Sequence, residues 1–231
     1  MLKKSQYFII SCMSEIQKYA SREAAGELLA DKIQELHLEK PYLLAIPRGG
    51  IQVAKAVADR LKIPINPLVV KKLPAPGNPE YGFGAITEDG TKILNEDAVD
   101  YLHLSPKIIE DISQKVISEI QHRKEYYGGL HDEKIHTSDV IIVDDGVATG
   151  YSLIAGIMTV QKRDPKSLWV AVPVSSENAY LKIKQIVKNV ICPIVNGEYF
   201  FAVASYYKEW YDLQEEEIKR ILEDYRAKYS D

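Results

Sequence analysis

Two adjacent carboxylates and a turn of small residues stand together at one point of the chain. A run of apolar residues, 140–143, ends in Asp144 and Asp145, and the turn 146–150 (Gly-Val-Ala-Thr-Gly) follows. If a helix begins after this turn, its free N–H groups and the positive end of its dipole favour a phosphate, and nearby hydroxyls add donors. Carboxylates beside that phosphate suit Mg²⁺ or the hydroxyls of an attached sugar. The segment therefore predicts a sugar phosphate site.

Two other interpretations of these carboxylates compete with that one. Asp144 and Asp145 could cap the following helix, although a cap needs only one acceptor. A nucleotide hydrolase could also use a strand that ends in two aspartates to bind magnesium, but the sequence contains neither GxxxxGK[ST] nor GxGxxG. The sugar phosphate site remains the better account of the pair.

Two further turns carry positive charge. Arg48 follows the apolar run 42–46, and Lys71 and Lys72 follow the apolar run 64–70. Because α/β proteins bind ligands at the carboxyl ends of parallel strands, these cations should converge with the two aspartates. The alternative is that each cation is a solvated side chain at an ordinary turn.

The elements around these turns alternate between helices and strands. Apolar residues recur at helical spacing in some segments and form short continuous runs in others. Strands that are apolar on both faces and joined by helices form a parallel sheet with right-handed crossovers. The sequence therefore predicts an α/β fold with a central, mostly parallel sheet flanked by helices. The expected helices are 15–38, 51–61, 105–127, 152–162, one capped near Ser175 or Ser176, and 212–228; the expected strands are 42–46, 64–70, 140–143, 168–174 and 190–195.

The stretch 71–89 is rich in residues that break regular structure. It contains three prolines and three glycines, so we expect an irregular, mobile loop with one short strand near 83–87. Long loops in compact domains are usually functional, so this stretch is a candidate functional loop.

The composition bounds the class of protein. Of 231 residues, 46% are hydrophobic and 27% are charged, as in ordinary folded domains. The formal net charge of -4 argues against nucleic-acid binding. No apolar stretch approaches the roughly 18 residues of a membrane helix, so we expect no membrane. Cys12 and Cys192 form no CxxC pair and no disulfide framework, and we expect a cytoplasmic protein.

The first residues are expected to lie outside the main domain. We predict an N-terminal extension over 1–14 and a single domain over 15–231. The apolar part of the extension is shorter than the roughly 7 to 15 residues of a signal peptide. Met13 is a candidate natural start, because the first expected helix begins just after it.

These motifs resemble those of the type I phosphoribosyltransferases. Residues 140–152 look like the family's motif for phosphoribosyl pyrophosphate (PRPP), and 46–50 look like its pyrophosphate loop. From residue 22 onward the chain resembles an uncharacterised bacterial and archaeal subgroup. Two positions depart from the pattern. Gly146 stands where the family usually has an aliphatic residue or serine, and Ala148 where 6-oxopurine transferases carry an aspartate, which disfavours hypoxanthine, guanine and xanthine.

The resemblance implies the family's fold, with a flexible lid at about 71–90 and a small hood and C-terminal helix at about 196–231. Its pyrophosphate loop often holds a non-proline cis peptide. The aromatic segment 199–211 could cover an acceptor base or simply pack. The implied site residues are Asp144, Asp145 and Lys72 for catalysis; Asp144 and Asp145 for Mg²⁺; Ala148, Thr149, Gly150, Tyr151 and Ser152 for the 5-phosphate of PRPP; and Arg48, Gly49 and Lys71 for pyrophosphate.

The implied function is Mg²⁺-dependent transfer of the ribose 5-phosphate group of PRPP to a nitrogen base, with release of pyrophosphate. Such an enzyme belongs to nucleotide metabolism, and homodimers are common in the family. The rival hypothesis is a PRPP- or nucleotide-sensing regulatory protein that kept the phosphate site but lost turnover. A closing lid with lysines favours the enzyme, because a transferase must exclude water from a reactive sugar cation.

Overall fold

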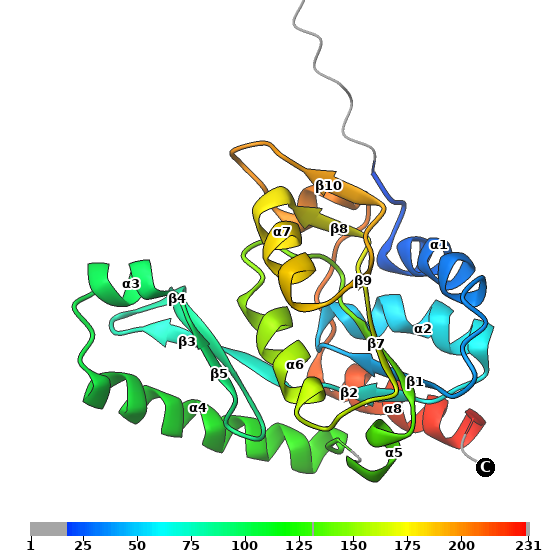
Figure 1. Ribbon diagram of the computed structural model, residues 1–231, viewed down its shortest axis with the longest axis horizontal. Coiled ribbons are helices and arrows are strands. Elements are labelled where there is room, and N and C mark those ends of the chain that lie inside the picture. The colour runs from blue at the N-terminus through cyan, green and yellow to red at the C-terminus, as the bar shows by residue number, and fades with distance from the viewer. Residues whose placement is uncertain (1–17, 131, 230–231) are drawn as a thin grey trace, which may run out of the picture.

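The computed structural model describes residues 18–130 and 132–229, arranged as an α/β body with an arm that extends to one side (Figure 1). The N-terminal extension and the candidate start at Met13 lie outside the described residues. Within the described ranges, no helix is both long and apolar enough to cross a membrane.

The body is built on a five-stranded sheet in the order β2-β1-β6-β7-β9, and all of its strand pairs are parallel. This confirms the predicted fold class. Ala45, Val143 and Ala171 are partners across β1, β6 and β7, so these strands end level with one another. The residues that follow them therefore meet at one edge. The strands are β1 (Pro41–Ala45), β2 (Ile65–Pro67), β6 (Asp139–Val143), β7 (Ser167–Ala171) and β9 (Asn189–Ile191).

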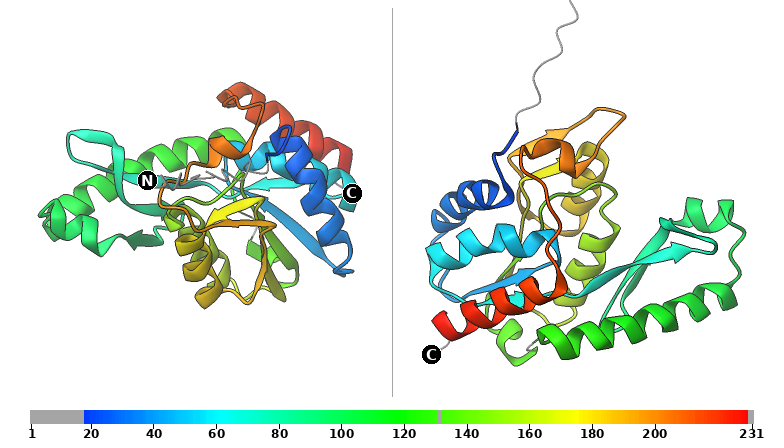
Figure 2. Two further views of the ribbon diagram at one scale, coloured as in Figure 1. Left: turned by 90° about the horizontal axis from the view of Figure 1, so that it is seen from above. Right: turned by 180° about the vertical axis from the view of Figure 1, so that it is seen from behind.

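Helices cover both faces of this sheet (Figure 2). In β1, Leu43 and Ala45 pack with α2 and α8, while Tyr42 and Leu44 pack with α6 and α7. This alternation explains why the strand is apolar on both faces. The helices of the body are α1 (Arg22–Gln34), α2 (Gly49–Leu61), α5 (Asp132–His136), α6 (Tyr151–Gln161), α7 (Glu177–Ile186) and α8 (Glu215–Tyr229).

Capping residues set the starts of two of these helices. Ser176 accepts a hydrogen bond from the backbone N–H of Ala179 at 3.2 Å, which confirms the predicted cap of α7. Ser21 accepts from Ala24 N in the same way, so α1 begins at Arg22. The predicted helix start at residue 15 was therefore wrong for the described residues 18–21.

The stretch 71–89 is regular, so the expectation of an irregular loop was wrong. It forms the hairpin of β3 (Val70–Ala75) and β4 (Asn78–Thr87), extended by β5 (Lys92–Leu94) into an antiparallel sheet. The hairpin turns at Pro76 and Gly77, where Gly77 has φ 75°, and the pairing register shifts at Pro74. Proline is tolerated there because β3 is an edge strand with a bulge.

Two helices complete the arm, α3 (Glu96–Tyr101) at its tip and α4 (Pro106–Tyr127) along its underside (Figure 1). Leu73 and Phe83 of the hairpin are fully buried and pack in one cluster with Ile109 of α4. The apolar face of the hairpin explains why it folds as a sheet despite its prolines.

Prolines also divide three of the predicted strands. The runs 64–70, 168–174 and 190–195 are each interrupted, at Pro67, Pro173 and Pro193. A proline lacks the N–H that would continue the ladder. The first part of each run joins the central sheet, while the later parts form β3, β8 (Val174–Ser176) and β10 (Ile194–Asn196). Strands β8 and β10 pair in parallel, and the short helix η1 (Val203–Tyr206) follows them.

Candidate active site

The two aspartates lie directly after β6, at the edge where the central strands end. The backbone N–H of Asp145 donates to Asp144 Oδ1 at 2.8 Å, which holds the two residues in a tight turn. Ile46, after the neighbouring strand β1, donates its N–H to Val143 O at 3.0 Å. The segment that carries Arg48 therefore continues beside the aspartates, as the strand order predicts.

The small-residue turn is fixed at both ends. Val147 donates its N–H to Val174 O at 2.9 Å, and Ser176 donates its N–H to Val147 O at 2.9 Å, so β8 holds the middle of the turn. Gly150 has φ 87° and precedes the first residue of α6. A residue with a side chain is strained in this left-handed region, which explains the glycine. The first turn of α6 thus presents its backbone N–H groups at the turn.

The turn and one aspartate line a cavity of about 190 Å³. Asp144 contributes to its wall, and Asp145 does not. The predicted phosphate residues Ala148, Thr149, Gly150 and Ser152 all contribute. This is the arrangement expected for a sugar phosphate, with hydroxyls toward the carboxylate and phosphate toward the helix.

The loop between β1 and α2 packs tightly against Asp145. The peptide bond between Pro47 and Arg48 is cis, as the resemblance implies. A Cβ atom on Gly49 would lie 1.8 Å from Asp145 Oδ2, so only glycine allows this approach. The Arg48 side chain is 42% exposed and its Nη2 lies 3.5 Å from Asp212 Oδ2. Arg48 is therefore partly exposed, and its ion-pair partner is the exposed carboxylate of Asp212.

The carboxyls of this turn are poorly solvated. Burial, together with the charge of Asp145, raises the pKa of Asp144 well above its ordinary value. Burial also raises the pKa of Asp145, although the Arg22 guanidinium beside it opposes the shift. The site thus concentrates negative charge where water stabilises it least, which is a common property of functional sites.

Arg22 is a residue of this site that sequence reasoning missed. It is the first residue of α1, is 3% exposed, and donates from Nε to Asp145 Oδ2 at 2.7 Å. In the sequence Arg22 has no feature that distinguishes it from other charged residues near the start of a helix. Because 123 positions separate the two partners, no local pattern could reveal the contact.

The two lysines occupy different faces of the arm. Lys71 forms an ion pair with Glu119 of α4, and Lys72 donates from Nζ to Glu80 O at 2.7 Å. Lys72 is the partner of Ala85 in the β3–β4 register, and Ala85 packs with α6. Lys72 thus lies on the face turned toward the body. The structure does not bring either lysine into contact with the aspartates, and their assigned roles remain predictions.

The aromatic segment 199–211 divides into exposed and buried parts. Tyr199 and Phe200 are 93% and 86% exposed, whereas Tyr206 and Tyr207 are buried. The Tyr207 hydroxyl donates to Asp145 O. A Cβ atom on Gly146 would lie 2.6 Å from a methyl carbon of Val203. The departure from the family pattern at residue 146 is therefore explained by the close approach of η1.

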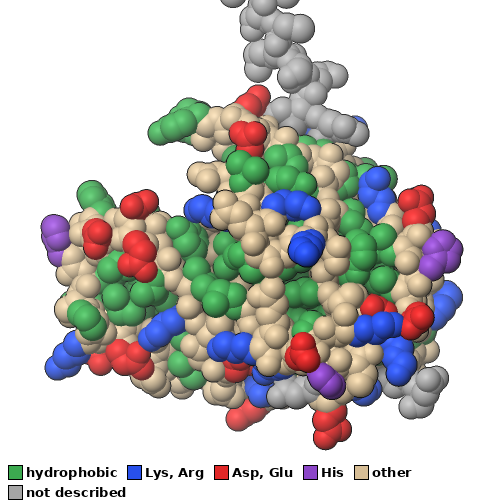
Figure 3. All heavy atoms as spheres, viewed as in Figure 1, with side chains coloured by type: hydrophobic (Ala, Val, Ile, Leu, Met, Phe, Trp, Pro, Cys, Tyr) green, Lys and Arg blue, Asp and Glu red, His purple; other side chains and the backbone are tan. Residues whose placement is uncertain are grey.

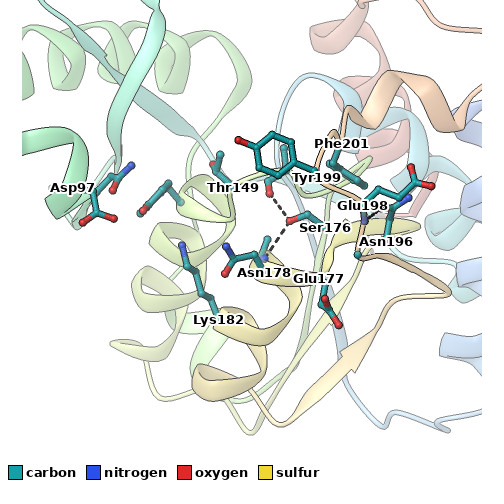
Figure 4. Close-up of a pocket in the computed structure, with 15 residues that line it drawn as sticks. Asp97, Thr149, Ser176, Glu177, Asn178, Lys182, Asn196, Glu198, Tyr199 and Phe201 are labelled. Carbon is teal, nitrogen blue, oxygen red and sulfur yellow. Dashed lines mark hydrogen bonds between the residues drawn. The ribbon is translucent and has the colours of Figure 1, made fainter. Parts of the chain in front are cut away.

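A second cavity of about 590 Å³ lies on the other side of Ala148 and Thr149. It opens beside the arm, where the sphere view shows a notch below the loop that follows β10 (Figure 3). Lys182 points into it from α7, and Tyr199 lies above Ser176 (Figure 4). Tyr151 lines this cavity and its ring lies 5.1 Å from Lys182 Nζ. Ala148 and Thr149 thus line both cavities, whereas Tyr151 lines only the larger one and Gly150 and Ser152 line only the smaller one.

The donor set fits a magnesium ion that binds together with substrate. No group of three or more His, Cys, Asp or Glu side chains that could hold a metal occurs in ranges 18–130 and 132–229. Mg²⁺ commonly binds through one or two carboxylates and takes its other ligands from water and substrate phosphates. Asp144, which lines the cavity beside the phosphate turn, meets this requirement, and Asp145 follows it in the chain.

Comparison with known proteins identifies relatives along most of the chain. The model of the phosphoribosyl transferase domain matches residues 13–210. The protein named "Putative phosphoribosyl transferase Rv0571c" of Mycobacterium tuberculosis is 32% identical over 206 residues, which cover 89% of this chain and 46% of that protein. The same identity and coverage hold for its counterpart in strain CDC 1551. The chain thus spans about half the length of these curated relatives.

A solved structure shares both fold and sequence with this chain. The crystal structure of TT1426 from Thermus thermophilus superposes with a TM-score of 0.71 and 33% sequence identity. The match covers 90% of this chain and 99% of that one. The fold of this chain therefore corresponds to almost the whole of another solved protein.

Proposed function

Because this chain belongs to the family of phosphoribosyl transferase domains, we propose that it transfers the ribose 5-phosphate group of PRPP to a nitrogen base. The bond between C1 of the ribose and the pyrophosphate oxygen breaks, and a bond from C1 to a base nitrogen forms. Pyrophosphate leaves with the bonding electron pair, and the base gives up a proton. The proposal includes a cytoplasmic protein that can form a homodimer.

One observation carries this proposal: Asp144 lines the same cavity as residues 148–150 and 152, and the loop that carries Arg48 packs against the adjacent Asp145. Carboxylate, phosphate cradle and cation are the three features that a ribose phosphate with a pyrophosphate at C1 requires. An ordinary helix cap would explain one acceptor and would leave Arg48 and the cavity unexplained.

Charge placement would supply most of the catalysis. As pyrophosphate departs, positive charge grows on C1 and the ring oxygen, as in glycosyl transfer. The carboxylates of Asp144 and Asp145 would stabilise that charge and orient the ribose hydroxyls, because they are held rigidly in a poorly solvated turn. Arg48 would attract the leaving group. Mg²⁺ at the two carboxylates would supply further neutralisation of the pyrophosphate charge.

Ala148 reduces the number of candidate acceptor bases. The alanine side chain has no group that could exchange a proton with a 6-oxopurine. Its neighbour Thr149 has a neutral hydroxyl and no carboxylate that could take that role. Adenine, uracil and orotate are therefore the first bases to test.

A second candidate function is a PRPP- or nucleotide-sensing regulator. The observation that favours it is that both arm lysines already have partners: Lys71 forms an ion pair with Glu119, and Lys72 donates to the backbone carbonyl oxygen of Glu80. A protein that binds but does not turn over needs the phosphate turn without a closing cation. The same experiment separates the two functions.

That experiment is a calorimetric titration with PRPP, with and without Mg²⁺, followed by the base panel in the same cell. Asp144→Asn should abolish magnesium-dependent binding, and Asp111→Asn on the exposed face of α4 should not. Reaction heat with one base would identify the acceptor, and the rate should fall on the order of 10²–10⁴-fold in Asp144→Asn, as for other positioned catalytic groups. Binding without turnover on any base would favour the regulator. A loss below tenfold would remove Asp144 from the proposed mechanism.

A further inference from the structure

The Arg22 guanidinium group contacts three separate segments of the chain, at Gln52, at Asp145 and at residues 210–212. Nε donates to Asp145 Oδ2 at 2.7 Å, and Nη1 donates to Gln52 Oε1 at 2.9 Å and to Tyr211 O. The guanidinium carbon lies 3.6 Å from the centre of the Trp210 ring. A planar fork with five donors can make this set of contacts, and a lysine ammonium cannot.

The same C-terminal segment also holds the backbone of Asp145. The Tyr207 hydroxyl donates to Asp145 O, while Trp210 and Tyr211 hold the arginine that binds the side chain of Asp145. We name residues 207–212 the strap. The strap thus contacts the aspartate directly at one end and through Arg22 at the other.

The two aspartates differ in their surroundings, and Arg22 contacts only one of them. Asp144 lines the 190 Å³ cavity, whereas Asp145 is held by Arg22 on Oδ2 and is 15% exposed. Gly49 leaves room for the Asp145 carboxylate and approaches Arg22 Nε itself, since a Cβ there would lie 3.0 Å from that atom. A buried arginine used only to join helices could bind any carboxylate, but this one binds the turn that ends β6.

We infer that Arg22 is a positioning residue of the ribose phosphate site, which fixes Asp145 by one carboxylate oxygen and ties it to the strap. This inference rests on the proposed function. Arg22 touches neither substrate nor reacting atoms in this arrangement. It acts by fixing the direction of the second Asp145 oxygen and the position of the turn that continues to Gly146.

The test is calorimetric titration of Arg22→Met and Arg22→Lys with PRPP and Mg²⁺, well below the unfolding midpoint of each variant. Arg60→Met is the matched control, because Arg60 also joins α2 to α1, through Glu27 and Asp31, but on the surface. We expect Arg22→Met to raise the Kd about 10–100-fold, as is usual when a partner of a binding group is removed. Stoichiometry should stay at one ligand per chain. The control should bind like the wild type.

Calorimetry measures the Kd and the stoichiometry separately, and these two quantities distinguish a positioning role from a purely structural one. A structural role would lower the competent fraction of the protein and leave the Kd of that fraction unchanged, and this result would overturn the inference. If Arg22→Met does not fold, Arg22→Lys decides, since it keeps the charge and loses the fork. A wild-type Kd in a folded Arg22→Lys protein would equally overturn the inference. Absence of PRPP binding in the wild type would instead reject the proposed function.

Trp210→Leu provides a second variant that leaves Arg22 in place. It removes the aromatic ring on which the guanidinium stacks, a cation–π contact. We expect a weaker Kd in the same direction as Arg22→Met, with stoichiometry unchanged. An unchanged Kd in this variant would show that the strap does not act on the site.

Discussion

Asp144 is held where its negative charge is disfavoured. Burial and the charge of Asp145 raise its pKa, so the folded protein binds this proton more tightly than the unfolded chain does. The stability associated with the proton is complete below the pKa of the unfolded state and is lost as the pH rises through the folded value. At neutral pH the ligand-free site therefore destabilises the fold.

In magnesium-free buffer, Asp144→Asn should therefore stabilise the protein near pH 8, by about 0.5–2 kcal/mol, as is common when a functional site is relieved. The gain should become small near pH 3, below the ordinary aspartate pKa of about 3.9, where the carboxyl is protonated in the folded and the unfolded state alike. Urea unfolding at both pH values measures the free energy of unfolding. An equal gain at the two pH values would contradict the argument.

Gly49 is the second residue whose identity the site dictates. Gly49→Ala places a methyl group against Asp145 Oδ2, and the overpacking should cost about 1–3 kcal/mol. PRPP binding should be lost with it, because the aspartate must move. Gly129→Ala is the control, since the three atoms nearest to a Cβ there all belong to the flexible side chain of Lys124. Thermal unfolding and calorimetry on both variants test this pair, and normal PRPP affinity in Gly49→Ala would refute the steric reasoning.

Among the elements, the arm is attached to the body through a polar cluster at the β4–β5 turn. Asp89 accepts from Thr87 Oγ1 at 2.7 Å, from Thr91 N at 3.0 Å and from Arg163 Nη1 at 3.1 Å. Burial alone would raise the pKa of Asp89, but the hydrogen bonds from the threonines lower it below its ordinary value. This carboxylate therefore stabilises the fold at neutral pH, and the contribution is lost as the pH falls through the folded pKa.

Asp89→Ala should lower the free energy of unfolding by about 1–3 kcal/mol at pH 7, because the donors around it lose a charged acceptor. The loss should become smaller toward pH 2. Asp111→Ala on the exposed face of α4 is the control, and urea unfolding is the measurement. A loss that is the same at both pH values would show that the carboxylate charge contributes nothing.

The elements that sequence reasoning predicted are those with a local signal. The turn 146–150 could be predicted because the two carboxylates before it, its own small residues and the helix after it are contiguous in the sequence. The β3–β4 hairpin could not be predicted in this way. It is ordered because Leu73 and Phe83 pack on α4, whereas its prolines locally indicate irregular structure. The strand breaks at Pro173 and Pro193 also have a local signal, the proline itself. A single strand was nevertheless predicted across each of these prolines, because the apolar runs continue past them.

At the scale of the whole molecule, the fold class follows from the alternation of strands and helices, whereas the site depends on contacts between distant segments. Arg22, Asp145 and the strap lie far apart in sequence, so their meeting could not be read from any window of the chain. Lys71 shows the converse. Its position after an apolar run indicated a ligand role, and the fold places it beside Glu119.

Ligand binding should stabilise the molecule as a whole. Free PRPP at about 100 times its Kd, with Mg²⁺, should add about 2.7 kcal/mol to the free energy of unfolding, since the unfolded chain has no site. The increase in unfolding temperature measures this effect. Asp144→Asn should show no increase, while Asp111→Asn should match the wild type. An equal increase in both variants would place the ligand elsewhere.

The strap also fixes when the site can be finished during synthesis. The central sheet is complete at Ile191, but Arg22 reaches Tyr211, 189 positions away, and Tyr207 reaches back to Asp145. A ribosome-bound chain can therefore pair all five strands before the segment that holds Asp145 has emerged. The newly made protein therefore acquires its central sheet first, and the turn that contains Asp145 is completed only after residues 207–212 have been added.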